Sequence, residues 1–251
     1  MSLLIQSALP DSSISHFVHS FWMLENNTGK DIPSTILPNG MVDLAVMNMG
    51  LQGWEISIRG LDTVQSAINI PVATKMFSIG FKLLAVEYLF GNSIKDVLNG
   101  GKNLSDKIWQ FEETDLNTFE NFCSKATQII KGIFIENIDN RKTKLFDLIY
   151  SSKGSLSVQE LSDNVFWSGR QINRYFNQQF GISLKAYCNI LRFGSSFKPI
   201  SEGNLFPDQN FTDQNHFIKE IKKYSGVTPK ELSKNKEDRF MDITVIKKLN
   251  K

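Results

Sequence analysis

The stretch SVQELSDNVFWSGRQINRYFNQQFG, residues Ser157–Gly181, contains the pattern that decides the fold of the carboxyl-terminal half. Ser157 is followed three residues later by Glu160, which is the spacing of a capping box at the start of a helix. Ser168 is a second N-cap, and apolar residues recur after it at the spacing of one helix face. These apolar residues are Ile172, Phe176 and Phe180. The stretch therefore predicts two short helices joined by a tight turn, a helix-turn-helix.

The opposite face of the second helix carries side chains that hydrogen-bond to base edges, and no carboxylate. These residues are Arg170, Gln171, Asn173, Arg174, Asn177 and Gln178. Arginine binds guanine O6 and N7 in bidentate fashion, and glutamine or asparagine does the same with adenine N6 and N7. We therefore expect this helix to lie in a major groove of DNA. The alternative is the polar outer face of a helical bundle, although such a face normally mixes glutamate with lysine.

A similar pattern returns in NFTDQNHFIKEIKKYSGVTP, residues Asn210–Pro229. Thr212 is predicted to cap a helix whose apolar stripe consists of Phe217, Ile221 and Tyr224. The polar residues of this helix are Asp213, Gln214, Asn215, His216, Lys219, Lys222 and Lys223. We expect Lys222 and Lys223 to pair with phosphates, which holds a protein on DNA without reading its sequence. His216 has two interpretations, a phosphate contact or packing beside Tyr224.

Length and composition indicate a globular protein with room for two domains. The chain has 251 residues, of which 41% are hydrophobic and 22% are charged. No apolar run approaches the ~18–20 residues that span a bilayer, and the first residues lack the basic segment of a signal peptide. The two cysteines, Cys123 and Cys188, stand far apart. We therefore expect a reduced, cytoplasmic protein.

The net charge of +2 conceals an asymmetry between the two halves of the chain. Residues 1–140 contain 9 Lys/Arg and 15 Asp/Glu, a net charge of −6. Residues 141–251 contain 19 and 11, a net charge of +8. A basic carboxyl-terminal half favours contact with a polyanion there.

The amino-terminal half reads mostly as β-structure, followed by helices. Short runs rich in Phe, Val, Ile and Trp, three of them followed by turn formers, predict strands. These runs are Ser15–Leu24, Met41–Met49, Trp54–Arg59 and Met76–Lys82. The expected fold class is α+β, a mostly β sensor-like domain with flanking helices followed by an all-α helix-turn-helix domain. After the last helix, Phe240–Ile246 alternates as a strand does and would dock on the first domain or a partner; a frayed tail is the alternative.

At the two helix-turn-helix stretches the chain resembles the AraC family of bacterial transcription regulators. The resemblance is strongest in FTDQNHFIKEIKKYSGVTPKEL, residues 211–232, and extends over residues 156–187. It implies two helix-turn-helix units joined by a linker helix. The family's base-reading positions correspond here to Arg170, Gln171, Asn173 and Arg174 in the first unit, and to Gln214, Asn215 and Lys219 in the second. LPNGMVDLAVMNMG, IRG and residues 77–109 also resemble an amino-terminal domain found in a subset of these regulators.

The chain departs from the family pattern in three places. Between Ile200 and Phe211 it is shorter, so that the bracing helix of the second unit is reduced to NLFPDQN. Gly194 and Pro199 predict that the linker helix kinks or stops early. Phe166 replaces the turn glycine of the first unit, which is costly where φ is positive. The first unit is therefore expected to be intact, and the second to keep its recognition helix on a weakened support.

Nothing in the sequence predicts an enzyme, a cofactor or a metal site. His16 and His19 would face opposite sides of a strand, and no phosphate-binding loop or nucleophile motif is present. Asp43, on an apolar strand, would satisfy a turn or bind a ligand amine. Trp22, Trp54 and Phe81 would line a pocket or pack in the core.

The sequence therefore predicts a DNA-binding transcriptional regulator. The expected division is a sensor or dimerisation domain over residues 1–136, a DNA-binding domain over 143–233 and a tail over 234–251. Double-stranded DNA is the expected partner, and a small-molecule effector and a homodimer are compatible with the pattern. The alternative is a ligand-binding or protein-interaction protein whose helix-turn-helix domain no longer reads DNA.

Overall fold

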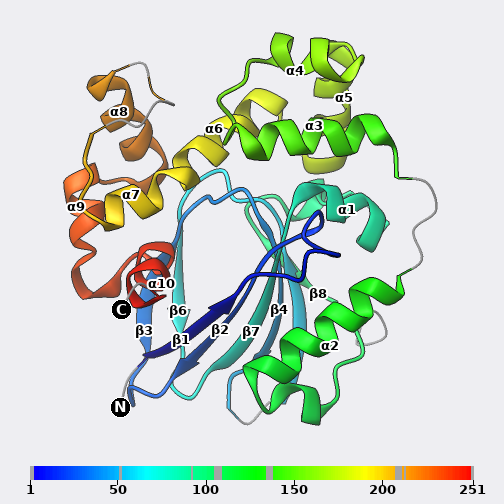
Figure 1. Cartoon of the computed structure of the whole chain (residues 1–251). Coiled ribbons are helices and arrows are strands. Elements are labelled where there is room, and N and C mark those ends of the chain that lie inside the picture. Colours follow the sequence, from blue (N-terminus) through cyan, green and yellow to red (C-terminus); the bar gives the residue numbers. More distant parts are fainter. Residues whose placement is uncertain are drawn as a thin grey trace. The chain divides into compact units, whose positions relative to one another are not determined.

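The computed structural model describes residues 3–50, 53–91, 93–104, 109–133, 138–206, 211 and 213–249, without the side chains of 248 and 249. The chain forms two compact units. The β-unit comprises Met1–Ile32, Met41–Gly60 and Asn69–Ile138, and the helical unit comprises Pro33–Gly40, Leu61–Ile68 and Asp139–Lys251. Strands dominate the first and helices the second (Figure 1), so the expected α+β class is confirmed.

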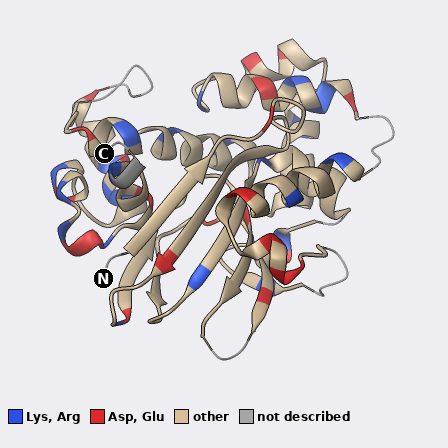
Figure 2. Ribbon diagram, turned by 60° about the horizontal axis from the view of Figure 1, so that its bottom comes forward, with Lys and Arg blue, Asp and Glu red and all other residues tan. Residues whose placement is uncertain are grey.

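The β-unit is built on a six-stranded antiparallel sheet with the order β1-β2-β7-β4-β5-β8. The strands are β1 (Leu3–Ala8), β2 (Val18–Asn26), β4 (Val42–Asn48), β5 (Trp54–Arg59), β7 (Lys75–Phe81) and β8 (Gly101–Asn103). The four internal strands match the four runs that the sequence predicts as strands, including Ser15–Leu24, which corresponds to β2. Few charged residues lie on these strands (Figure 2).

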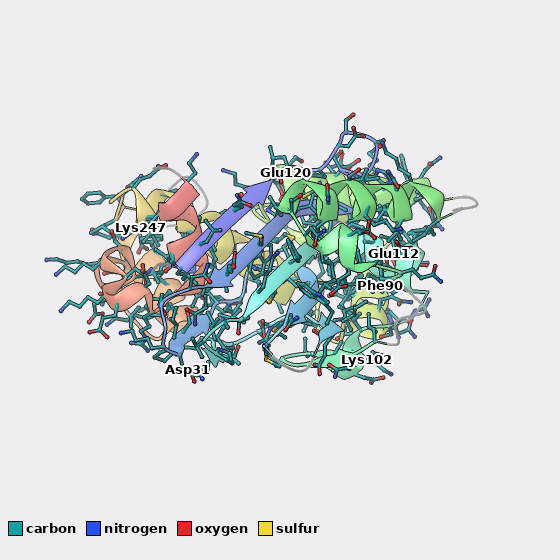
Figure 3. The ribbon with its side chains drawn as sticks, turned by 90° about the horizontal axis from the view of Figure 1, so that it is seen from below. Asp31, Phe90, Lys102, Glu112, Glu120 and Lys247 are labelled. Atoms are coloured by element: carbon teal, nitrogen blue, oxygen red, sulfur yellow. The ribbon has the colours of Figure 1, made fainter. Side chains whose placement is uncertain are left out.

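One face of this sheet is buried under the helices of the same unit, which are α1 (Leu83–Phe90), η1 (Lys95–Val97), η2 (Glu113–Leu116) and α2 (Phe119–Gly132). The ring of Phe122 on α2 stacks on Phe77 at 5.0 Å and meets the ring of Phe21 edge-on at 6.3 Å. Thr118 caps α2 by accepting a hydrogen bond from the backbone N–H of Asn121. The outer side of α2 carries exposed residues such as Glu120 (Figure 3). The α2 helix therefore covers an aromatic core.

The other helices of the described residues belong to the helical unit. They are α3 (Asn140–Ser151), α4 (Val158–Val165), α5 (Gly169–Phe180), α6 (Leu184–Ser195), α7 (Phe197–Ser201), α8 (Gln214–Ser225), α9 (Pro229–Lys234), η3 (Lys236–Asp238) and α10 (Met241–Leu249). The linker helix α6 ends at Ser195, and α7 begins two residues later, so the predicted early stop is confirmed. Of the reduced bracing segment NLFPDQN, residues 207–210 lie outside the described residues.

Two segments from the amino-terminal half belong to the helical unit, which the sequence did not predict. Residues 33–40 and 61–68 form what we call the first arm and the second arm. They contain most of β3 (Ile32–Ile36) and β6 (Ser66–Ile70), which pair as a separate two-stranded sheet. The chain therefore passes between the two units five times, at residues 32/33, 40/41, 60/61, 68/69 and 138/139.

The prediction of a strand at Phe240–Ile246 is wrong, because this segment forms the helix α10. Its β-branched residues favour a strand by local propensity, but burial follows a helical spacing. Phe240, Met241, Ile243 and Thr244 are buried, at positions i, i+1, i+3 and i+4. Residues 234–251 are part of the helical unit.

Candidate nucleic-acid interface

The first helix-turn-helix begins with the capping box read from the sequence. The hydroxyl oxygen of Ser157 accepts a hydrogen bond from the backbone N–H of Glu160 at 3.2 Å, and the Ser157 N–H donates to the Glu160 carboxylate at 2.8 Å. These bonds satisfy donors that the first turn of α4 would leave unpaired. Leu161 and Val165 bury the inner face of α4. The helix α4 is therefore fixed at its start and along one side.

The turn between α4 and α5 has a left-handed residue at its first position. Phe166 adopts φ 53° and ψ 38°, the conformation that glycine accepts most easily. Its side chain is 88% exposed, so no burial offsets the cost of this conformation. The positive φ anticipated for this position is therefore present.

A second capping box starts α5. The hydroxyl of Ser168 accepts from the backbone N–H of Gln171 at 3.3 Å, and the backbone N–H of Ser168 donates to Gln171 Oε1 at 3.0 Å. The Ser168 hydroxyl also donates to Gln171 Oε1 at 2.7 Å. The side-chain carbonyl of Gln171 is therefore engaged in capping the helix.

The α5 helix buries one aromatic face and exposes one polar arc. Its buried residues are Ile172, Tyr175, Phe176 and Phe180. The rings of the last three pack around Phe146 of α3 with centroids 5.8–6.4 Å apart. The exposed arc consists of Arg170, Gln171, Arg174, Asn177 and Gln178. At 100° per residue Arg174 lies at the middle of this arc. The structure therefore brings together on this arc five of the six polar residues of the face predicted to meet DNA.

Asn173, the sixth, is engaged within the protein. Its Nδ2 donates to the carbonyl oxygen of Gly169 at 3.0 Å, and its Oδ1 accepts from the backbone N–H of Leu184 at 3.3 Å. The second bond joins α5 to the start of the linker helix α6. This geometry fits a residue that positions α5 better than one that contacts a base.

The α8 helix of the second unit begins one residue later than predicted. Asp213 is the N-cap, and its carboxylate accepts from the backbone N–H of His216 at 2.9 Å; Thr212 lies outside the described residues. Phe217, Ile221 and Tyr224 are buried as predicted. The ring of Tyr224 stacks on Phe193 of α6 at 5.0 Å. The recognition helix of the second unit is therefore supported by the linker helix.

The predicted contact residues of α8 are exposed. They are Gln214, Asn215, Lys219, Lys222 and Lys223. Asn215, Lys219 and Lys222 recur at i, i+4 and i+7 and so share one stripe. Lys223 Nζ lies 3.7 Å from the carboxylate of Glu220. Figure 2 shows basic residues on the helices of this unit.

His216 packs rather than faces solvent. Its ring centroid lies 5.9 Å from that of Phe211, and its Nδ1 is buried without a hydrogen-bond partner among the residues described. Of the two interpretations of His216, the geometry favours packing over a phosphate contact. The ring that it packs on is Phe211, whereas the sequence predicted Tyr224.

The aromatic residues of the β-unit do not form one pocket. Trp54 packs on Phe77 at 5.8 Å and Phe81 on Trp109 at 5.8 Å, all on the helix-covered face of the sheet. Trp22 lies directly opposite Ser78 in the β2–β7 ladder and therefore on the other face. Core packing is the outcome for Trp54 and Phe81.

The other face of the sheet carries a polar cluster around Asp43. The indole N–H of Trp22 donates to Asp43 Oδ1 at 3.5 Å, and the hydroxyl of Ser78 donates to the same oxygen at 3.3 Å. Arg59 is directly opposite Asp43 in the β4–β5 ladder. The carboxylate thus joins three strands, and the cluster combines acidic, basic and hydroxyl groups on one face.

Within the described ranges, no group of three potential metal ligands comes together. The same residues include no helix that is both long and apolar enough to cross a membrane.

One comparison with known proteins matches part of the amino-terminal half, and another finds solved structures that are similar over most of the chain. Residues 6–101 match a family model described as a domain of unknown function, DUF6597. A comparison with curated proteins finds no match. Among solved structures, ToxT from Vibrio cholerae O395 is similar over 92% of this chain and 95% of its own, with 15% identity and a TM-score of 0.39.

Two liganded ToxT structures are also similar to this chain. ToxT bound to (E)-4-(8-methylnaphthalen-1-yl)but-3-enoic acid is 13% identical over 92% of this chain and 97% of its own, with a TM-score of 0.41. Unsaturated fatty acid bound ToxT from strain SCE256 is 12% identical over 92% and 94%, with a TM-score of 0.39. The residues of the candidate interface lie outside the part matched by the family model.

Proposed function

We propose that this protein is a bacterial, cytoplasmic transcription regulator of the AraC type that binds double-stranded DNA through two helices, α5 and α8. The observation that carries the proposal is the exposed arc of α5. Arg170, Arg174 and Asn177 stand on it without a carboxylate, on a helix whose start is fixed by a capping box and whose inner face packs in an aromatic core. This is the arrangement in which the second helix of a helix-turn-helix enters a major groove.

The two helices have different parts in this proposal. Arg170 and Arg174 read base edges, with the free amide end of the Gln171 side chain beside them. Asn173 positions α5 from within the protein. On α8, Gln214 and Asn215 lie at the groove, and Lys219, Lys222 and Lys223 pair with phosphates. The basic charge of residues 141–251 supports contact with the DNA backbone.

The β-unit is proposed to bind a small-molecule effector and to bring two chains together as a homodimer. The polar cluster of Asp43, Arg59 and Ser78 supports an effector with polar groups, because an acid, a base and a hydroxyl lie on one sheet face. Binding there would alter how the helical unit engages DNA.

The test is selection of bound sequences by the full chain from a random duplex library, followed by titration of the enriched sites at two salt concentrations. A recurring motif whose binding weakens steeply with salt is the expected outcome. The length of the motif reports whether one helix-turn-helix unit or two read DNA. Folded protein that enriches no sequence at either salt would support instead a ligand-binding or interaction protein with a non-reading module.

A further inference from the structure

The two arms reach different helices of the helical unit. They are held together by the pairing of β3 with β6. Each continues directly into a strand of the β-unit, since the first arm ends at Gly40, two residues before β4, and the second follows β5. A displacement of these strands is therefore passed by the chain itself to the arms.

The first arm is bound on one side by the carboxyl-terminal segment. The backbone N–H of Thr35 donates to the carbonyl oxygen of Arg239 at 2.7 Å. The backbone N–H of Leu37 donates to one carboxylate oxygen of Asp242 at 3.0 Å, and Asn39 Nδ2 donates to the other at 3.4 Å. Asp242, in the first turn of α10, thus holds two donors from residues two positions apart in the first arm.

A buried asparagine fixes this carboxyl-terminal segment. Asn235 Oδ1 accepts from the backbone N–H of Phe240 at 2.8 Å, and its Nδ2 donates to Thr244 Oγ1 at 2.8 Å. Lys247, labelled on α10 in Figure 3, donates to the carbonyl oxygen of Ser233 at 2.5 Å. The segment that presents Asp242 is therefore tied to α9 at both ends.

The other side of the first arm lies against the linker helix α6. The buried hydroxyl of Tyr187 donates to the carbonyl oxygen of Gly40 at 3.0 Å. A Cβ on Gly40 would lie 2.6 Å from Leu191 Cδ2, and Gly40 has φ +81°. A Cβ on Gly194 would lie 3.2 Å from the carbonyl oxygen of Asn39. Glycine at both positions permits this close approach.

The second arm reaches the end of α8. Gly226 terminates α8 in the left-handed conformation, with φ +73°. A Cβ on Gly226 would lie 2.6 Å from Gln65 Nε2. The arms therefore contact both the linker helix and the recognition helix of the second unit.

We propose that the arms and α10 form a strut, a support that sets the position of α8 relative to α6. We call the carboxylate of Asp242 its clasp, because its hydrogen bonds to Leu37 and Asn39 join the first arm to α10. The inference rests on the proposed function for its DNA part only. The strut supports α8 in a unit whose bracing segment is expected from the sequence to be shortened. An effector that moves β4 or β5 therefore changes the DNA contact of α8 before that of α5.

The test compares the full-length variants Asp242→Ala and Glu237→Ala. Both remove one acidic side chain from the carboxyl-terminal segment, but Glu237 is exposed and lies on η3. Hydrogen exchange is followed at the Leu37 amide, on α6 around Tyr187 and on α8. Asp242→Ala is expected to speed exchange about tenfold or more at all three, because the charged acceptor is lost. Glu237→Ala leaves it unchanged.

Footprinting on the selected DNA site supplies the second readout. Asp242→Ala is expected to lose protection over the half-site of α8 and keep that of α5. Unchanged exchange on α6 and α8 in Asp242→Ala overturns the strut whether or not the protein binds DNA. If Asp242→Ala exchanges faster but the wild-type protein selects no DNA, the strut is supported and the proposed function is overturned. If Asp242→Ala does not fold, Asn39→Asp opens the clasp by placing a second carboxylate beside Asp242, with the same outcomes.

Discussion

Arg174 lies at the middle of the exposed arc of α5, and in the proposed function it is the residue on which sequence reading depends most. Arg174→Ala is expected to weaken binding to the selected site by ~1–3 kcal/mol, or about 5- to 150-fold. Arg174→Lys keeps the charge but not the planar fork, so it should retain affinity for random DNA and lose discrimination. Titration of selected and random duplexes measures both effects.

Lys95→Ala is the control for Arg174→Ala, because it removes one exposed positive charge from the β-unit. It should leave both affinities unchanged. An equal loss on selected and random DNA for Arg174→Ala would identify Arg174 as a backbone contact.

The ionisation of the Cys188 thiol makes the free energy of unfolding depend on pH in the alkaline range. Burial raises the pKa of its thiol from the ordinary 9.0 to about 11. Between these values the unfolded thiol ionises while the folded thiol keeps its proton, so stability falls as the pH rises. The full effect above the folded pKa is ~2–3 kcal/mol. Urea unfolding at about pH 8 and about pH 10.5 should show this loss, and Cys188→Ala should reduce it. Burial also raises the pKa of Tyr187, so part of the loss of stability at alkaline pH should remain in Cys188→Ala.

At the scale of elements, the turn between α4 and α5 is strained by Phe166. Phe166→Gly is expected to raise the free energy of unfolding by ~0.5–1 kcal/mol, because glycine adopts a positive φ at lower cost. Phe166→Ala removes the exposed ring and keeps the Cβ, so it should gain much less. Urea unfolding of both variants measures the difference. A destabilised Phe166→Gly would mean that the ring contributes more than its exposure suggests.

The elements that the sequence predicted are those whose signals are local. Ser157 and Ser168 were predicted as helix starts because each capping box lies within four residues. The strand predicted at 240–246 failed because β-branched propensity is weaker than burial of a helical face. The short strands β1, β3, β6 and β8 were missed, and for β3, β6 and β8 the reason is a partner strand about 30 or more residues away in sequence. The hydrogen bonds of Asn173 could not be predicted from the sequence, because one of them joins α5 to the backbone of Leu184 at the start of another helix.

At the scale of the molecule, the helical unit is not one continuous stretch of sequence, and this limits what can be excised from it. The fragment 139–251 lacks both arms and with them Leu37 and Leu61, which are fully buried in the whole chain. Each such side chain contributes ~1.5–3 kcal/mol when buried. The fragment also lacks the N–H groups of Leu37 and Asn39 that donate to Asp242, and the carbonyl oxygen of Gly40 that accepts from Tyr187.

We therefore expect the fragment 139–251 to unfold at a lower temperature than the helical unit of the full chain, and less cooperatively. Calorimetry and amide hydrogen exchange of the fragment and the full chain measure the difference. Residues around Tyr187 and on α10 should lose protection first, whereas α4 and α5, whose packing partner Phe146 is retained, should stay protected. A fragment with the full protection of α6 and α10 would show that the arms only rest on the helical unit. Selective loss would show that the second helix-turn-helix unit depends on the two arms, which come from the amino-terminal half of the chain. In the proposed function, this dependence is how a signal from the β-unit would reach DNA.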